Sequence, residues 1–98
     1  MVVTQLEGKV GPGQWETLKQ AYRKEIQRSL PAYIYQTYLV QDETNRDTWR
    51  ILTVWQSRQA LQDYRASVET PSGVLMFRAA GVEPVLSIYE VVDRSRGG

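Results

Sequence analysis

The sequence of 98 residues contains neither cysteine nor histidine. Without cysteine there is no disulfide, no thiolate nucleophile and no cysteine-ligated zinc or iron–sulfur site. Without histidine the chain lacks the commonest acid–base residue, the commonest metal ligand and the usual axial ligand of haem, and it cannot build a Ser-His-Asp triad. No spacing of the remaining residues resembles a metal cage or a phosphate-binding loop. The sequence therefore predicts no metal site and no cofactor.

The sequence also lacks an excess of charge of one sign and has no long apolar run. Twelve Lys and Arg residues face eleven Asp and Glu residues, for a net charge of +1. The signs are interspersed, whereas nucleic-acid-binding proteins concentrate basic residues on one face. No apolar run approaches the ~18–20 residues of a membrane span, and the first residues lack the pattern of a signal peptide. We therefore expect a cytoplasmic protein that binds neither nucleic acid nor membrane.

What is present is an ordinary globular composition, with 42% hydrophobic and 23% charged residues. Alternating apolar residues predict strands, and apolar residues three and four apart predict helices between them, in the order βαββαβ. The predicted strands are 2–9, 33–41, 48–56 and 85–92. Residues 1–93 form one domain in this interpretation, and residues 94–98 form a flexible C-terminal tail. In the second strand, strict alternation places Tyr33, Tyr35, Thr37 and Leu39 on one side and Ile34, Gln36, Tyr38 and Val40 on the other.

Proline and glycine set the predicted helix boundaries. The first helix should continue to Leu30, because the residue before Pro31 avoids the helical conformation. In the second helical region, Thr70 as N-cap and Pro71 in the first turn would begin a short helix that Gly81 ends.

In a small protein this order typically gives a ferredoxin-like α+β fold, a four-stranded antiparallel sheet with the helices on one face. Both faces of the strands are nevertheless apolar. In the third strand, Ile51 and Trp55 point to one side while Leu52 and Val54 point to the other. Because the helices can cover only one face, the other would be an exposed apolar surface. We therefore predict a homodimer that packs sheet to sheet about a two-fold axis.

The third strand and the following helix carry a short motif. The segment from Ile51 to Leu61 reads ILTVWQSRQAL, and it resembles the W-x-S-x-x-A/L signature of the antibiotic biosynthesis monooxygenase (ABM) domain family. The resemblance in architecture covers residues 2–92. It implies the same βαββαβ order and a dimeric α+β barrel. That family includes cofactor-independent monooxygenases of anthrone- or dihydroquinone-like aromatics and haem-degrading oxygenases.

The positions that serve haem degradation in the family differ here. Those members use an Asn on the first strand, a Trp on the second helix and a later His. The corresponding residues of this chain are Leu6, Tyr64 and Val74. The resemblance therefore does not imply haem degradation.

The anthrone-type members match at one position. Their pocket Trp corresponds to Trp55, whereas their Asn aligns with Ile51 and their helix Tyr with Leu61. The resemblance implies a cofactor-independent monooxygenase that acts on a small reduced aromatic substrate, quinol- or anthrone-like. Two alternatives remain: a non-catalytic dimeric binding or regulatory protein that holds a hydrophobic metabolite in the same pocket, and a structural dimer whose pocket is filled by its own side chains, including Phe77 and Leu61.

The candidate site combines aromatic and small polar residues. Trp55 would stack on a flat substrate, or else close the core between sheet and helix. Tyr64 would donate a hydrogen bond to a substrate oxygen, or else be a core tyrosine. Thr53 is polar in an apolar strand and needs a partner, which can be a ligand, a neighbouring side chain or water. The predicted catalytic residues are Trp55 and Tyr64, and the predicted substrate-binding residues are Thr53, Ile51, Leu6, Leu61 and Phe77.

Overall fold

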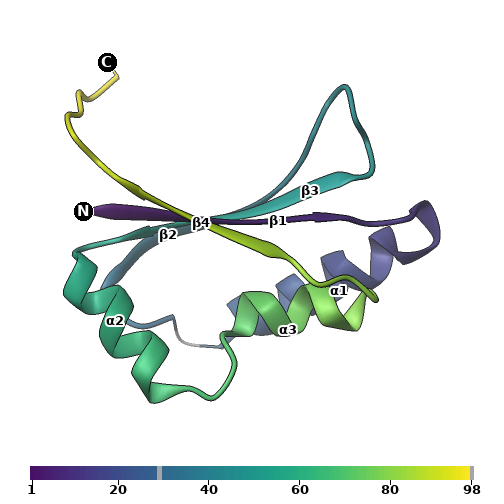
Figure 1. The fold of residues 1–98 in the computed structure, drawn as a ribbon, viewed down its shortest axis with the longest axis horizontal. Coiled ribbons are helices and arrows are strands. Elements are labelled where there is room, and N and C mark those ends of the chain that lie inside the picture. The colour runs from purple at the N-terminus through teal and green to yellow at the C-terminus, as the bar shows by residue number, and fades with distance from the viewer. Residues whose placement is uncertain (29, 98) are drawn as a thin grey trace.

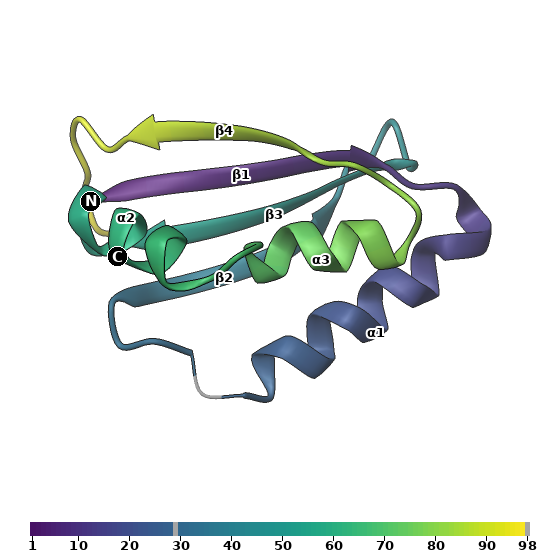
Figure 2. The same cartoon turned by 60° about the horizontal axis from the view of Figure 1, so that its bottom comes forward.

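The computed structural model describes residues 1–28 and 30–97. A four-stranded antiparallel sheet has the order β2-β3-β1-β4, and the α-helices all lie on one face of it (Figures 1 and 2). This confirms the predicted ferredoxin-like α+β fold. The elements are β1 (Val2–Lys9), a 3-10 turn η1 (Pro12–Gln14), α1 (Trp15–Ile26), β2 (Ile34–Gln41), β3 (Thr48–Trp55), α2 (Arg58–Ser67), α3 (Ser72–Ala79) and β4 (Val85–Glu90).

None of the helices in the described part of the chain is long and apolar enough to cross a membrane. The first helix ends at Ile26, so the prediction that it continues to Leu30 was wrong. The ring of Pro31 would clash with the carbonyl of Gln27, four residues earlier, and this prevents a further turn of helix. Ser29, which the predicted helix included, and Gly98, in the predicted tail, lie outside the described residues.

The start of α3 also differs from the prediction. Its N-cap is Pro71 rather than Thr70, and Pro71 is extended, with ψ at 144°. The carbonyl of Pro71 accepts hydrogen bonds from the N–H groups of Val74 and Leu75, so the helix begins one residue later than predicted. Beyond its end, Gly81 has a φ of 78°. This left-handed conformation favours glycine and ends the helix as the sequence indicated.

A β-bulge in β2 changes which residues face the helices. Ile34 pairs with Trp55 and Gln36 pairs with Val54, so Tyr35 is an extra residue in the ladder. Strict alternation was therefore wrong at Ile34: it lies opposite Trp55, on the helix side, and so does Thr37 beyond the bulge. The last strand ends at Glu90, before the predicted Val92.

One glycine allows the closest packing between sheet and helix. A Cβ atom on Gly8 of β1 would lie 2.8 Å from both the Phe77 ring and the Val82 side chain. Since real Cβ atoms do not approach so closely, only glycine permits α3 to pack at this depth. Phe77 is consequently fully buried, at 0% exposure.

The core on the helix side of the sheet consists of two separate clusters. The first contains Phe77, Leu18 and Trp49 among its buried residues, and the second is built around Trp55 and Leu61. Between them the sheet presents small polar side chains instead of large apolar ones. Thr53 of β3 pairs with Thr37 of β2 and with Thr4 of β1. We call Thr37, Thr53 and Thr4, which cross three strands in line, the threonine row.

Candidate functional site

A cavity of about 570 Å³ lies between the sheet and the helices, bordered by both core clusters. The threonine row forms its floor. All of the residues predicted for the site except Phe77 line this cavity. They divide into an aromatic end and an aliphatic end: Trp55, Tyr64 and Leu61 at one, and Leu6 and Ile51 at the other.

The threonine row is hydrogen-bonded within the protein. The hydroxyl oxygens of Thr37 and Thr53 are 3.3 Å apart, so the partner that Thr53 requires is a neighbouring side chain. The Trp55 indole donates to the hydroxyl oxygen of Thr4 over 3.0 Å. This bond uses only one of the two hydroxyl hydrogens, so the other hydrogen of the Thr37–Thr53 pair can be donated elsewhere. The hydroxyl hydrogen of Thr4 likewise has no acceptor among residues 1–28 and 30–97. The cavity floor can therefore donate hydrogen bonds to a ligand oxygen.

Trp55 belongs both to the core and to the cavity wall. It is 5% exposed and lines the cavity. Its ring stacks on Tyr33 with centroids 6.2 Å apart and an interplanar angle of 17°. It also meets the Tyr64 ring at 5.3 Å. The two alternatives for Trp55 are therefore compatible, because neighbouring rings and the bond to Thr4 fix the indole in place.

The Tyr64 hydroxyl joins α2 to α3. It accepts a hydrogen bond from the backbone N–H of Ser72 at 3.0 Å and donates one to the Ser72 hydroxyl at 3.1 Å. The first bond satisfies an N–H at the start of α3, where Pro71 supplies no capping side chain. The hydroxyl that can still donate into the cavity at this end is that of Ser72, which the sequence did not reveal as a site residue.

Phe77 and Thr37 are placed differently from the sequence expectation. Phe77 lies wholly within the first core cluster and does not line the cavity. Thr37 lines it although it was not a candidate. The sequence signal for Thr37 is the same as for Thr53, a threonine within an apolar strand.

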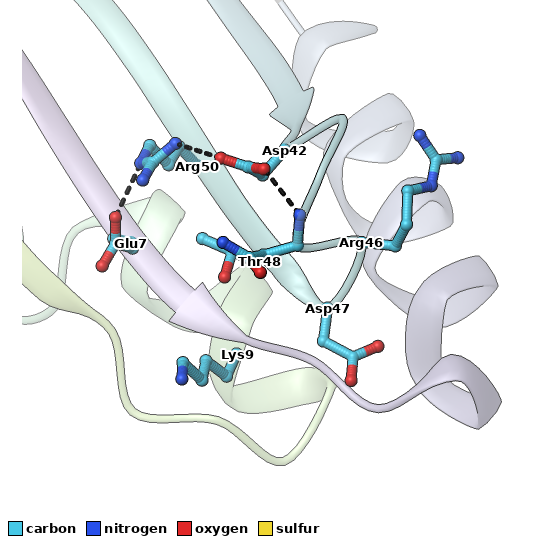
Figure 3. A pocket seen from close by; sticks show the side chains of 8 residues that line it. Glu7, Lys9, Asp42, Arg46, Asp47, Thr48 and Arg50 are labelled. Atoms are coloured by element: carbon cyan, nitrogen blue, oxygen red, sulfur yellow. Dashed lines mark hydrogen bonds and ion pairs between the residues drawn. The ribbon is translucent and has the colours of Figure 1, made fainter.

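A second, polar pocket lies on the other face of the sheet, at the β2–β3 turn (Figure 3). Arg50 donates to Glu7 over 2.6 Å and lies 3.5 Å from Asp42. Hydrogen bonds from the backbone N–H groups of Asn45 and Thr44 lower the pKa of Asp42, and Arg50 lowers it further. These groups satisfy one another and hold the turn. The charges around the pocket balance: Glu7, Asp42 and Asp47 against Lys9, Arg46 and Arg50.

The family model of the antibiotic biosynthesis monooxygenases (ABM) matches residues 1–71. The chain belongs to this family. The match runs from β1 to Pro71, the N-cap of α3, and includes β3 with Trp55 and α2 with Tyr64. Comparison of this ABM chain with curated proteins gives no match in sequence.

Solved structures resemble the ABM chain over 95% or more of its length. A proposed antibiotic biosynthesis monooxygenase from Deinococcus radiodurans has a TM-score of 0.74 at 13% identity, with 100% of this chain and 99% of that chain covered. One from Nitrosomonas europaea has a TM-score of 0.69 at 15% identity, covering 95% and 100%. A mutant of MhuD, with two manganese protoporphyrin IX bound per active site, has a TM-score of 0.74 at 18% identity, covering 99% and 100%. At such identities the similarity establishes the fold.

The cavity of this ABM chain does not suit the haem chemistry of the family. Leu6, Tyr64 and Val74, at the positions that haem-degrading members use, all line the cavity. Leucine and valine offer iron no ligand, and the Tyr64 hydroxyl is engaged with Ser72. Histidine is absent from the entire sequence. Within the described residues, no three Asp, Glu, His or Cys side chains gather as a metal site either.

Proposed function

We propose that this protein is a cofactor-independent monooxygenase that oxidises a small reduced aromatic substrate, quinol- or anthrone-like. The observation that carries the proposal is the cavity of about 570 Å³ with apolar walls and a hydroxyl-bearing floor. Its size and lining suit a flat molecule of two or three fused rings. Membership of the ABM family supports the reaction class.

The chemistry needs only the substrate and molecular oxygen. In an anthrone-like substrate, the activated CH₂ group loses a proton to water and becomes a resonance-stabilised carbanion. The carbanion gives one electron to O₂, and the resulting radical pair combines to a peroxide anion at that carbon. This anion takes back the proton that was released to water and becomes a hydroperoxide. Loss of water then leaves a carbonyl group. One oxygen atom enters the product, the other leaves as water, and the two hydrogens of the CH₂ group balance that water.

The protein binds, orients and desolvates the substrate in this scheme. Leu6, Ile51 and Leu61 surround the ring system, and Trp55 packs against it. The hydroxyls of Thr4 and Thr53 donate to the ring oxygen on which the carbanion charge is delocalised. Donors already in place at that oxygen stabilise the anion and so favour loss of the proton. In this scheme Tyr64 is a positioning residue, since its hydroxyl holds Ser72.

Oxygen uptake tests the proposal. The metal-stripped protein is mixed with a panel of anthrones and hydroquinones, and autoxidation is subtracted. We expect protein-dependent uptake that falls about tenfold or more in Thr53→Val and also falls in Trp55→Phe. Thr17→Val is the matched control, because Thr17 lies exposed on α1 and does not line the cavity. Absence of uptake above background with every substrate would contradict the proposal.

One observation favours the alternative of a non-catalytic binding or regulatory protein. Glu25 is the only acidic side chain that lines the cavity in the described structure, and it belongs to α1 and not to the sheet that carries the threonine row. No carboxylate is therefore placed at the floor to take a substrate proton. Quenching of tryptophan fluorescence by aromatic ligands, lost in Trp55→Phe and unaccompanied by oxygen uptake, would establish this alternative.

We also propose that the chain forms a homodimer through the outer face of the sheet. Tyr38 and Tyr89 on this face are 45% and 51% exposed, and Leu52 and Val54 lie between them on β3, one of the two central strands. The helices cover the opposite face (Figure 2). Packing of two outer faces would bury this surface and leave each subunit with its own cavity.

A further inference from the structure

We infer that the substrate carries a carboxylate beside its aromatic rings, and that Arg65 at the mouth of the cavity binds it. The inference rests on the proposed function of the same cavity and narrows its substrate class. It begins from the charged residues that line an otherwise apolar space.

Arg65 lies at the edge of the cavity-facing side of α2. Leu61, Tyr64 and Arg65 of this helix all line the cavity, at the three- and four-residue spacing of one helix face. Leu61 is buried and Tyr64 is half-buried, whereas Arg65 is exposed. An exposed arginine that still lines a cavity is typical of a rim position, in which the aliphatic stem covers apolar wall and the guanidinium stays in water.

The charges at the rim do not cancel. Besides Arg65, the charged residues that line the cavity are Glu25 and Arg28 of the α1 end. An Arg28 nitrogen lies 3.5 Å from a Glu25 carboxylate oxygen, so these two compensate each other. Among residues 1–28 and 30–97, none of the ion pairs involves Arg65. The mouth therefore carries one uncompensated positive charge.

The surroundings of Arg65 favour an amphiphilic ligand. Four exposed large apolar side chains also line the cavity, namely Ile26, Leu30, Leu75 and Leu86, at 39%, 45%, 52% and 41% exposure. They can cover the ring system as it enters. A neutral ligand in this position would partly desolvate Arg65 without replacing the lost water, whereas a carboxylate can accept two parallel hydrogen bonds from the guanidinium. The cavity thus selects for an aromatic acid.

Calorimetric titration with a matched ligand pair tests the inference. The probes are 1-hydroxy-2-naphthoate and 1-hydroxy-2-naphthamide, which share shape and differ in charge. We expect the acid to bind about three- to tenfold more tightly than the amide. Arg65→Gln should abolish this preference and leave the affinity for the amide nearly unchanged. Arg58→Gln is the control, since Arg58 is exposed on the same helix and does not line the cavity, and it should keep the preference.

The outcomes separate this inference from the proposed function. Equal affinities for acid and amide, or a preference that survives Arg65→Gln, overturn the role of Arg65 and leave the cavity as a binding site for neutral aromatics. Failure of both compounds to bind overturns the inference together with the ligand-binding premise of the proposed function. A preference lost in Arg65→Gln and kept in Arg58→Gln supports the inference.

Discussion

Thr4 links the buried aromatic end of the site to its floor. Its side chain is 7% exposed, and its hydroxyl accepts the hydrogen bond of the Trp55 indole at 3.0 Å. A tryptophan N–H buried without a partner is costly, whereas removal of both partners can be nearly neutral. The pair therefore constrains Trp55 to one orientation, in which it lines the cavity.

At the residue scale, Thr4→Val should lower the free energy of unfolding by about 1–3 kcal/mol, because the indole N–H loses its acceptor. In a Trp55→Phe background the same substitution should cost clearly less. Urea denaturation of the two single variants and the double variant measures the difference. An equal cost of Thr4→Val in both backgrounds would show that this hydrogen bond does not stabilise the fold.

At the scale of elements, the helical segment between β3 and β4 is divided in two, and Tyr64 bridges the division. Pro71, the N-cap residue of α3, has no side-chain acceptor with which to cap this helix. The Tyr64 hydroxyl bonds to the Ser72 N–H instead. Tyr64, which the sequence suggested as a hydrogen-bond donor to substrate, thus has a structural role.

Tyr64→Phe is accordingly expected to reduce stability by about 1 kcal/mol through loss of this cap. Ser72→Ala removes the hydroxyl that accepts from Tyr64 but keeps the backbone N–H and its acceptor, so it should cost less. Urea denaturation compares the two variants. If Tyr64→Phe unfolds at the same urea concentration as the unaltered protein, the hydroxyl does not stabilise α3. In that case a loss of oxygen uptake in this variant would point to contact with the substrate.

At the scale of the whole molecule, the single sheet has two different faces: one borders the cavity, and the other is not covered by helices. Thr53 faces the cavity, while its neighbours Leu52 and Val54 face the opposite side. The outer face also carries the compensated ion cluster of Arg50, bonded to Glu7, at one end. An apolar centre with a polar border is typical of surfaces that bind another protein.

The homodimer proposal predicts twice the chain mass in light scattering at micromolar concentration. Leu52→Lys should convert the protein to a monomer, because a charge at the centre of the interface would be buried without a partner. Gln62→Lys, on the exposed side of α2, should remain dimeric. A monomer in the unaltered protein would rule out a stable dimer of this kind.

Much of the fold could be predicted because hydrophobic periodicity follows the faces of each element. The strand order and the ends of elements depend on contacts that one sequence does not display. Pro31 indicated a helix end, but its clash acts on the turn before it, so α1 ends at Ile26. The bulge at Tyr35 became visible only from the pairing of Ile34 with Trp55.

The candidate site was predictable to a similar degree. A family motif and strand alternation selected Trp55 and Thr53, which the structure brings to one cavity. Phe77 has the same apolar character as the lining residues. It lies in the core and not at the cavity because α3 packs closely against Gly8. Placing Thr37 at the cavity required knowledge of the bulge and of its cross-strand pairing with Thr53. Ser72 could be recognised as a site residue only from its hydrogen bonds with the Tyr64 hydroxyl, which no local sequence pattern predicts.

The interruption of the core by the threonine row has a thermodynamic consequence. The two apolar clusters are joined by the sheet, and an aromatic ligand between them would complete a single continuous core. Binding to the folded state alone raises stability by mass action, by about 2.7 kcal/mol at a ligand concentration one hundred times the Kd. The melting temperature of this small protein should therefore rise with each aromatic acid that binds in the cavity, and heating is expected to rank a library of such acids by affinity.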